Sequence, residues 1–208
     1  MTISATTQGL RMGVATSTSR PTVPFDGQVI SETDTDSLQV YKGSAWAPVS
    51  GLTLITAQTI GTAVSSVTVS SAFSSTYTNY RIVTVGGTCS GNNDLSLALG
   101  STATGYYSGL SYVVYANGTA AGASNNNAAS WVFAGTCNTF SPFLDVDLYQ
   151  PNIASQTFMS SRLMGASSGG AAGGYLNNTT QYTSFTLTPA GGVTLTGGTI
   201  RVYGYANS

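Results

Sequence analysis

Alternation of apolar and polar residues with a period of two is the feature of this sequence that most limits its fold. The pattern recurs in six segments: Val67–Val69, Ile82–Val85, Leu95–Leu99, Leu144–Leu148, Phe185–Thr188 and Ile200–Tyr203. Successive side chains of a β-strand point to opposite faces, so this period is typical of half-buried strands. Segments rich in Gly, Asn and Ser lie between them and are expected to be turns, namely Gly86–Asn93, Asn117–Asn127, Gly165–Gly174 and Pro189–Gly198. We therefore predict an all-β chain that forms a two-sheet sandwich, with a jelly roll as the expected topology.

Charge is scarce and unevenly placed along the chain. Thirteen of 208 residues are charged, the net charge is −1, and seven of the 13 fall within residues 1–50. This shift in composition predicts three parts: an extended arm over residues 1–20, a small β-meander or collar over 21–50, and the sandwich over 51–208. A meander of about 30 residues cannot bury enough surface to be stable alone. We therefore expect it to pack on a partner, and a symmetric copy of the chain is the simplest one.

The composition also excludes several classes of function. Six scattered Lys and Arg residues cannot neutralise a phosphate backbone, so no nucleic-acid partner is expected. The chain has no His, which is the commonest general base near neutral pH and the commonest zinc ligand. There is no apolar run of 18 residues and no signal-peptide pattern, so membrane insertion is not expected. We predict that the protein is not an enzyme and that it uses no cofactor.

Two short motifs have the letters of functional sites. Residues Gly165–Gly169 match the spacing of a hydrolase nucleophile elbow, but a serine nucleophile needs a base and the sequence has no His. Residues Glu32–Asp36 resemble the acidic start of a calcium loop, yet Ser37 and Gly43 occupy the sixth and twelfth positions, where Gly and Glu are required. A hairpin turn whose side chains bind nearby backbone amides is the favoured interpretation of the second motif.

Asp145 and Asp147 are two residues apart in a predicted strand and so share one face. They would bind a cation if a third oxygen ligand such as Asp94 approached. The alternative is a pair of solvated carboxylates beside Arg or polar partners.

Cys89 and Cys137 are expected to be buried thiols of a protein made in a reducing cytosol, with a disulfide as the alternative.

Four tyrosines within ten residues form a candidate glycan-binding cluster. We single out Tyr106, Tyr107 and Tyr112, whose rings could stack on sugars, while ordinary packing of Tyr in strands is the alternative. Binding residues concentrate on loops held by a rigid scaffold, so residues 101–127 and 165–180 are the expected location of such a site.

The segment Ser19–Val49 resembles a segment common in tail-fibre and minor-tail proteins of tailed bacteriophages. The shared pattern is R-P-x-x-P-[FY]-x-G-Q-x-I-x-E-T-D-T-x-x-L-x-V-Y-x-G-[ST]-x-W. It is matched here by Arg20, Pro21, Pro24, Phe25, Gly27, Gln28, Ile30, Glu32, Thr33, Asp34, Thr35, Leu38, Val40, Tyr41, Gly43, Ser44 and Trp46. The segments GSTATGYYSG, LNNTTQYTSFTLTP and GTIRVYGYANS also resemble phage minor-tail sequences.

The resemblance implies a virion protein, usually trimeric, with a β-rich distal domain and no catalytic residues to carry over. We expect a homotrimeric tail fibre or baseplate-attached minor tail protein, made in the host cytoplasm and located in the virion tail. Its expected partners are its own copies, another virion protein, and a host cell-surface glycan. The alternative is a capsid decoration protein or head fibre that stabilises the shell. The residues expected to anchor the chain and form the trimeric collar are Arg20, Pro21, Pro24, Phe25, Ile30, Leu38, Val40, Tyr41 and Trp46.

Overall fold

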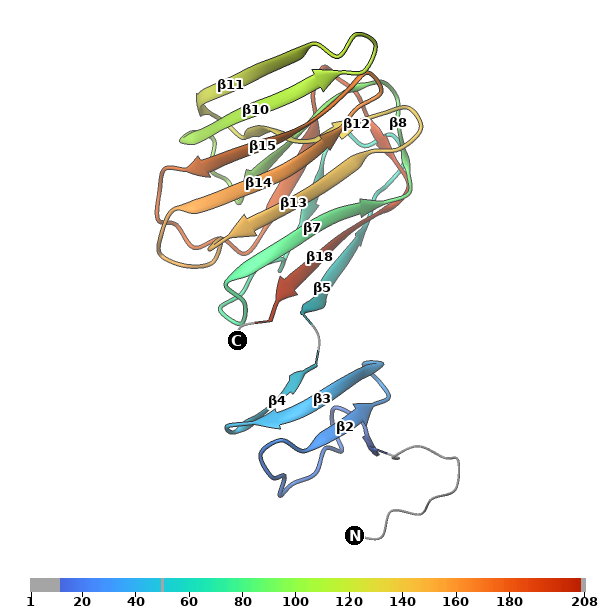
Figure 1. Cartoon of the computed structure of the whole chain (residues 1–208), viewed down its shortest axis with the longest axis vertical. Coiled ribbons are helices and arrows are strands. Elements are labelled where there is room, and N and C mark those ends of the chain that lie inside the picture. The colour runs from blue at the N-terminus through green and yellow to red at the C-terminus, as the bar shows by residue number, and fades with distance from the viewer. Residues whose placement is uncertain (1–11, 50, 207–208) are drawn as a thin grey trace. The chain divides into compact units, whose positions relative to one another are not determined.

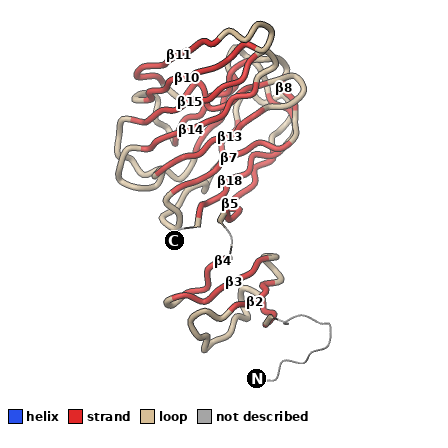
Figure 2. Tube along the Cα trace, viewed as in Figure 1, coloured by secondary structure: helices blue, strands red, loops and turns tan. Residues whose placement is uncertain are grey.

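The computed structural model describes residues 12–49 and 51–206, which form strands and turns without any helix (Figure 2). In chain order the strands are β1 Gly13–Ala15, β2 Val29–Glu32, β3 Ser37–Lys42, β4 Ala45–Pro48, β5 Leu52–Thr59, β6 Val67–Val69, β7 Asn79–Val85, β8 Thr88–Cys89, β9 Asn93–Leu99, β10 Tyr106–Val114, β11 Ala120–Ala128, β12 Trp131–Cys137, β13 Phe143–Tyr149, β14 Thr157–Met164, β15 Ser168–Leu176, β16 Phe185–Pro189, β17 Leu195–Thr196 and β18 Thr199–Tyr205. The predicted all-β class is confirmed.

The chain divides into two compact units, Met1–Thr53 and Leu54–Ser208. The first unit contains a four-stranded sheet in the order β1-β2-β3-β4. Strands β2, β3 and β4 form an antiparallel meander, and β1 adds parallel to β2. Gly43 has a φ of 71° in the two-residue turn between β3 and β4, a conformation that favours glycine.

The predicted arm over residues 1–20 is wrong for its second part, because β1 and the residues after it belong to the folded unit. Val14 pairs with Ser31 of β2, and the backbone N–H of Ser17 donates to Asp34 at 2.9 Å. On the edge of β2 that does not pair with β3, backbone N–H and C=O groups would lack partners, and pairing with β1 provides these partners. Residues 1–11 of the predicted arm lie outside the described residues.

The second unit is a sandwich of two sheet layers. Figure 1 shows β11, β10, β15, β14, β13, β7, β18 and β5 in this order across one layer. The other layer has the order β12-β9-β16-β6, and the two layers join where β12 pairs with β13 at two positions. A short pair, β8 with β17, lies beside them. The predicted two-sheet sandwich is confirmed, while its jelly-roll topology stays a prediction.

The buried core is formed by the apolar residues of the strands in which apolar and polar residues alternate. In β9, Leu95, Leu97 and Leu99 are fully buried, while the residues between them are only partly buried. The largest fully buried side chains from both layers include Trp131, Tyr80, Tyr106, Phe185, Ile82, Leu97, Leu148 and Leu187. Full burial of each such aliphatic side chain stabilises the fold by about 1.5–3 kcal/mol relative to exposure.

Cys89 and Cys137 form a disulfide, so the expectation of two free thiols is wrong. Their Cα atoms lie 5.6 Å apart, and the backbone N–H of Cys89 donates to the carbonyl oxygen of Asn138 at 3.2 Å. Packing of β8 beside the end of β12 brings together two residues that are 48 positions apart. A separation of this length gives no local signal, so the spacing in sequence could not reveal the pairing.

Candidate functional site

One face of the first unit's sheet is apolar and exposed. Strand register places Val29 opposite Val40 and Ser31 opposite Leu38, and the N–H of Val49 donates to the carbonyl oxygen of Leu38. Directly opposed residues point to the same side of a sheet. This side therefore carries what we call the apolar face, made of Val14, Val29, Leu38, Val40 and Val49.

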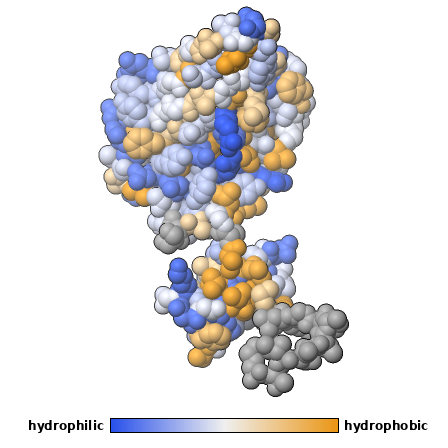
Figure 3. All heavy atoms as spheres, in the orientation of Figure 1, coloured by the Kyte–Doolittle hydropathy of each residue, from blue (hydrophilic) through white to orange (hydrophobic). Residues whose placement is uncertain are grey.

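The side chains of the apolar face are unusually accessible for their type. Val14 is 62% exposed, Val49 55% and Leu38 41%. Figure 3 shows hydrophobic residues gathered on the visible side of this unit. Exposed apolar side chains are ordinary when scattered singly, but a contiguous group on one face marks an interaction surface.

The opposite side of the same sheet holds the unit's own small core. Ile30 is 1% exposed and Gln39 is 6% exposed, and the rings of Tyr41 and Trp46 pack edge to face with centroids 5.4 Å apart. The structure therefore separates the predicted collar residues into groups: Leu38 and Val40 lie on the apolar face, whereas Ile30, Tyr41 and Trp46 lie on the internal side. Pro21, Pro24 and Phe25 precede β2, and Phe25 is exposed.

Arg20 is held against this unit by a two-pronged ion pair with Glu32. Its Nε donates to Glu32 Oε1 at 2.7 Å and its Nη2 to Oε2 at 3.0 Å, and the Thr35 hydroxyl also donates to Oε2. The hydrogen bonds from Arg20 hold the pKa of Glu32 below its ordinary value, against the opposing effect of burial. Arg20 is thus a residue that stabilises the fold of the collar.

The acidic motif Glu32–Asp36 forms the turn between β2 and β3. The backbone N–H and the hydroxyl of Ser17 donate to Asp34, and these hydrogen bonds lower the pKa of Asp34. Asp36 has a φ of 49°, which Asp tolerates in turns. The described residues contain no group of three or more acidic or Cys side chains able to hold a metal ion. The geometry is that of a hairpin turn.

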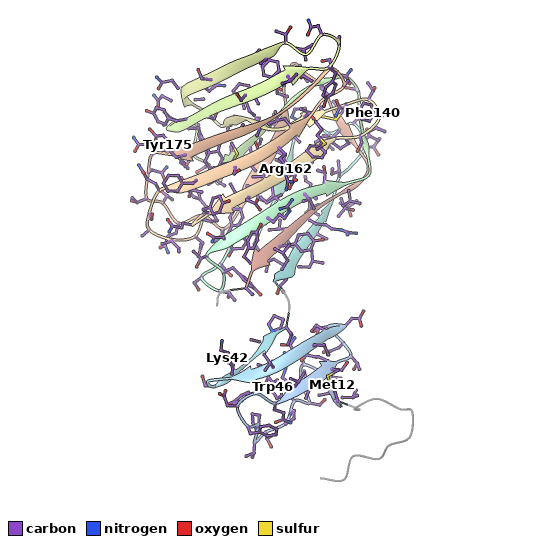
Figure 4. All side chains as sticks on the ribbon, viewed as in Figure 1. Met12, Lys42, Trp46, Phe140, Arg162 and Tyr175 are labelled. Carbon is purple, nitrogen blue, oxygen red and sulfur yellow. A yellow bond between two sulfur atoms is a disulfide. The ribbon has the colours of Figure 1, made fainter. Side chains whose placement is uncertain are left out.

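Asp145 and Asp147 lie in an ion-pair network on the exposed face of the first layer. Arg81 pairs with Asp145 and approaches Asp147 at 3.6 Å, and Arg162 Nε lies 2.8 Å from Asp145. Figure 4 shows Arg162 on β14 within this layer. Asp94 is on β9 in the other layer, so the hypothesis of a cation site with Asp94 is wrong. The alternative, carboxylates beside Arg partners, is confirmed.

The three singled-out tyrosines do not form one cluster, because Tyr107 points to the opposite face of β10 from Tyr106 and Tyr112, which are six residues apart. Tyr106 is fully buried, its hydroxyl accepts the N–H of Leu99 at 2.7 Å, and its ring packs edge to face on Trp131. Burial raises the pKa of Tyr106, and the residue cannot contact an external glycan, which corrects that prediction. Tyr107 points to the other face and stacks on Tyr175, labelled in Figure 4, with centroids 4.9 Å apart.

Tyr112 lines a cavity of about 390 Å³ in the second unit. A second cavity of about 280 Å³ adjoins it and shares four lining residues, Asp94, Thr136, Ser167 and Ser168. We call the two cavities together the Asp94 groove. The remaining lining residues are Asn92, Asn93, Leu110, Val114, Ala123, Phe133, Cys137, Asn138, Leu163, Gly165, Ala166, Gly169 and Gly170.

The walls of the Asp94 groove come from strands β9, β10, β11, β12, β14 and β15 and from the loops next to them. Asp94 of β9 pairs directly with Thr136 of β12, so both side chains point to the same side. The hydroxyl of Thr136 donates to the carbonyl oxygen of Met164, which ties β12 to the end of β14. The turn between β14 and β15 closes the groove, with the N–H of Gly165 donating to the carbonyl oxygen of Ser168 at 2.8 Å. This turn contains Gly165–Gly169, the segment that matches a nucleophile elbow only in its letters, and it forms one edge of the groove.

The sequence predicted a binding site on segments 101–127 and 165–180 and singled out Tyr112. Both segments and Tyr112 contribute to the groove. The prediction missed Asn138 and Thr136, which have no distinctive pattern in sequence, and it assigned Asp94 to a different site.

No helix among the described residues is long and apolar enough to cross a membrane. Comparisons of the chain with protein-family models, with curated proteins and with solved structures find no match.

Proposed function

We propose that this chain is a structural protein of a tailed-bacteriophage virion, a homotrimeric tail fibre or minor tail protein whose sandwich contributes to host attachment and has no catalytic role. The phage assignment rests on the resemblance of residues 20–46 to the tail-protein segment quoted above. The observation that carries the assembly role is the apolar face of the first unit.

The apolar face supports self-association for an energetic reason. Val14, Leu38 and Val49 each retain between about two-fifths and three-fifths of their accessible surface. Covering that surface stabilises a complex by about 1 kcal/mol for each side chain, at roughly 25 cal/mol per Å². A threefold axis presents the same face of every copy to its neighbours, so each chain gains this burial at once. The small four-stranded unit would then gain a second buried layer in addition to its own small core.

We also propose that the sandwich is a jelly roll. Four of its pairings are nested: β5 pairs with β18, β6 with β16, β7 with β13, and β9 with β12. In a single long hairpin rolled into two layers, the first strand pairs with the last strand. Each further pair lies, in chain order, between the two strands of the pair before it. The hairpins β10–β11 and β14–β15 extend one layer beyond this frame. They provide walls of the Asp94 groove.

Immuno-gold electron microscopy with antibodies against the purified chain tests the virion assignment. Particles from the lysate in which the chain is produced should carry label at the tail. Label on the head would support the alternative, a capsid decoration protein or head fibre. Particles that carry no label, with the antigen remaining in the soluble fraction, would contradict a virion role altogether.

A further inference from the structure

We propose that the Asp94 groove is a binding site for a neutral saccharide, with the Asp94 carboxylate and the Asn138 amide oxygen accepting hydrogen bonds from its hydroxyl groups. The biological role of such binding rests on the proposed attachment function, but the binding itself is a property of the isolated chain.

The charge of the groove indicates which class of ligand can bind there. Asp94 is the only charged side chain among the described residues that line either cavity. Its carboxylate makes no hydrogen bond or ion pair with any other described side chain or backbone group, and partial burial raises its pKa. An anionic ligand would be repelled by this carboxylate. A ligand that offers hydroxyl donors would satisfy it without bringing a second charge into the groove.

Asn138 provides an independent observation that points to a donor. The residue is 1% exposed, and its Nδ2 donates to the carbonyl oxygens of Ser141 at 3.2 Å and Met164 at 3.1 Å. These two acceptors fix the orientation of the amide, because the oxygen cannot face two carbonyls. Its Oδ1 is buried and has no partner among the described residues, and Asn138 lines the second cavity. An unpaired buried acceptor destabilises the unbound protein, and a bound hydroxyl would satisfy it.

The groove has both apolar and hydroxyl-bearing residues, and a sugar ring likewise has both apolar C–H faces and polar O–H edges. Leu110, Tyr112, Phe133 and Leu163 form an apolar and aromatic wall, while Thr136, Ser167 and Ser168 provide hydroxyls. A pyranose has C–H faces that pack on such a wall and O–H edges that form hydrogen bonds. The larger cavity falls within the range of about 300–1,000 Å³ that is usual for small-molecule sites.

Glycine allows β15 to pair closely with β10 beside the aromatic wall of the groove. A Cβ on Gly170 would overlap the backbone of Ser111 and Tyr112, and one on Gly169 would overlap the hydroxyl of Tyr115. The backbone of β15 therefore approaches β10 closely, and Gly170 pairs directly with Tyr112 in the wall of the groove.

NMR titration of the full ¹⁵N-labelled chain tests the proposal. The probes are the methyl glycosides of glucose, galactose and mannose, together with N-acetylglucosamine, at millimolar concentrations. At least one of them should shift the amide signals of Gly165, Gly169 and Gly170 and the side-chain amide of Asn138. The signals of Gly109 and Gly173, which do not line the groove, should stay in place. If none of the four probes shifts the groove signals, the proposal is overturned.

The saccharide affinity of three variants tests whether binding takes place in the groove. Asp94→Asn should weaken binding at least tenfold, because a hydrogen bond to a charged group contributes about 1.5–3 kcal/mol. Tyr112→Ala should weaken binding as well, whereas Tyr107→Ala, on the other face of the same strand, should leave it unchanged. Circular dichroism checks that each variant is folded. Equal affinity of the wild type and of folded Asp94→Asn and Tyr112→Ala would overturn the proposal.

Charged analogues separate the proposed ligand class from others. Glucuronic acid should bind more weakly than glucose. Glucosamine that binds more than tenfold more tightly than glucose would indicate an amine site instead, and would overturn the neutral-saccharide assignment. These results do not depend on oligomeric state or on virion labelling, so failure of this inference and failure of the proposed function remain distinguishable.

Discussion

Two buried or partly buried carboxylates, Glu32 and Asp94, show how different surroundings give one chemical group different roles. Glu32 accepts three hydrogen bonds, two of them from Arg20, and its pKa is lowered. Asp94 has no such partner among the described residues, and its pKa is raised by burial. A charge that is buried and paired supports the fold, whereas one that is buried and unpaired favours binding of an external group.

Glu32→Gln should destabilise the first unit by about 1–3 kcal/mol, because it removes hydrogen bonds to a charged partner. Since the folded-state pKa of Glu32 is lowered, its contribution is present above the ordinary pKa of about 4.3 and is lost as pH falls through the folded value. Urea denaturation followed by Trp46 fluorescence in a Trp131→Phe background measures this. Asp36→Asn removes the same charge from the same turn and is the control. Equal effects of the two substitutions would contradict the role given to the ion pair.

Asp94 should produce the opposite dependence on pH. Because its folded-state pKa is raised, the free energy of unfolding should decrease as pH rises from the ordinary Asp value of about 3.9 through the folded value. Saccharide affinity should instead increase over the same window, because the carboxylate becomes a stronger acceptor. Titration calorimetry at several pH values measures the affinity, and Asp94→Asn should abolish its pH dependence. A wild-type affinity that is constant across this window would refute the role of Asp94 as acceptor.

At the scale of strands, sequence patterns predicted the core strands well and the peripheral ones poorly. Strands β9, β13 and β18 show clear alternation because one of their faces is buried. The segments 117–127 and 165–174 were expected to be turns, yet β11 and β15 occupy most of them. Their Gly, Ala and Asn residues have low strand propensity, and these strands form because β10 and β14 supply edges to pair with. The groove depends on those pairings, so only Tyr112 and its neighbouring loops could be expected from the sequence.

Close packing of β15 explains its glycines and provides a matched test. A Cβ on Gly174 would overlap the carbonyl oxygen of Tyr107 and press on Trp131, whereas the nearest atom to a Cβ on Gly173 is 3.8 Å away. Gly174→Ala should therefore lower the free energy of unfolding by about 1–3 kcal/mol. Gly173→Ala should change it much less, as chemical denaturation can measure. Equal destabilisation by the two substitutions would show that overpacking is not the cause.

The disulfide joins β8 to the end of β12 beside the groove. Intact mass of the unreduced chain should be two hydrogens lower than that of the reduced chain. The double variant Cys89→Ser, Cys137→Ser should lose about 4 kcal/mol of stability, because the crosslink closes a loop of 48 residues. Calorimetric unfolding of the variant and of the oxidised wild type measures this difference. Two titratable thiols in the unreduced native protein would contradict the pairing.

At the scale of the whole molecule, the two units differ in how much charge they carry. The second unit contains six charged residues, of which Arg81, Asp145, Asp147 and Arg162 belong to one network. Its sequence is rich in Ser, Thr and Asn, whose hydroxyl and amide groups suit contact with neutral polar ligands. The first unit holds more than half of the charges and also the apolar face. This division supports a chain that assembles through one unit and binds through the other.

Sedimentation velocity of the purified full chain tests the central proposal most directly. The expected species contains three chains of 21.2 kDa each. Leu38→Asp on the apolar face should dissociate this species to monomers. Val113→Asp, at a residue of similar exposure in the second unit, should leave the trimer intact. A monomeric wild-type chain, or a Leu38→Asp variant that remains trimeric, would contradict assembly through the apolar face.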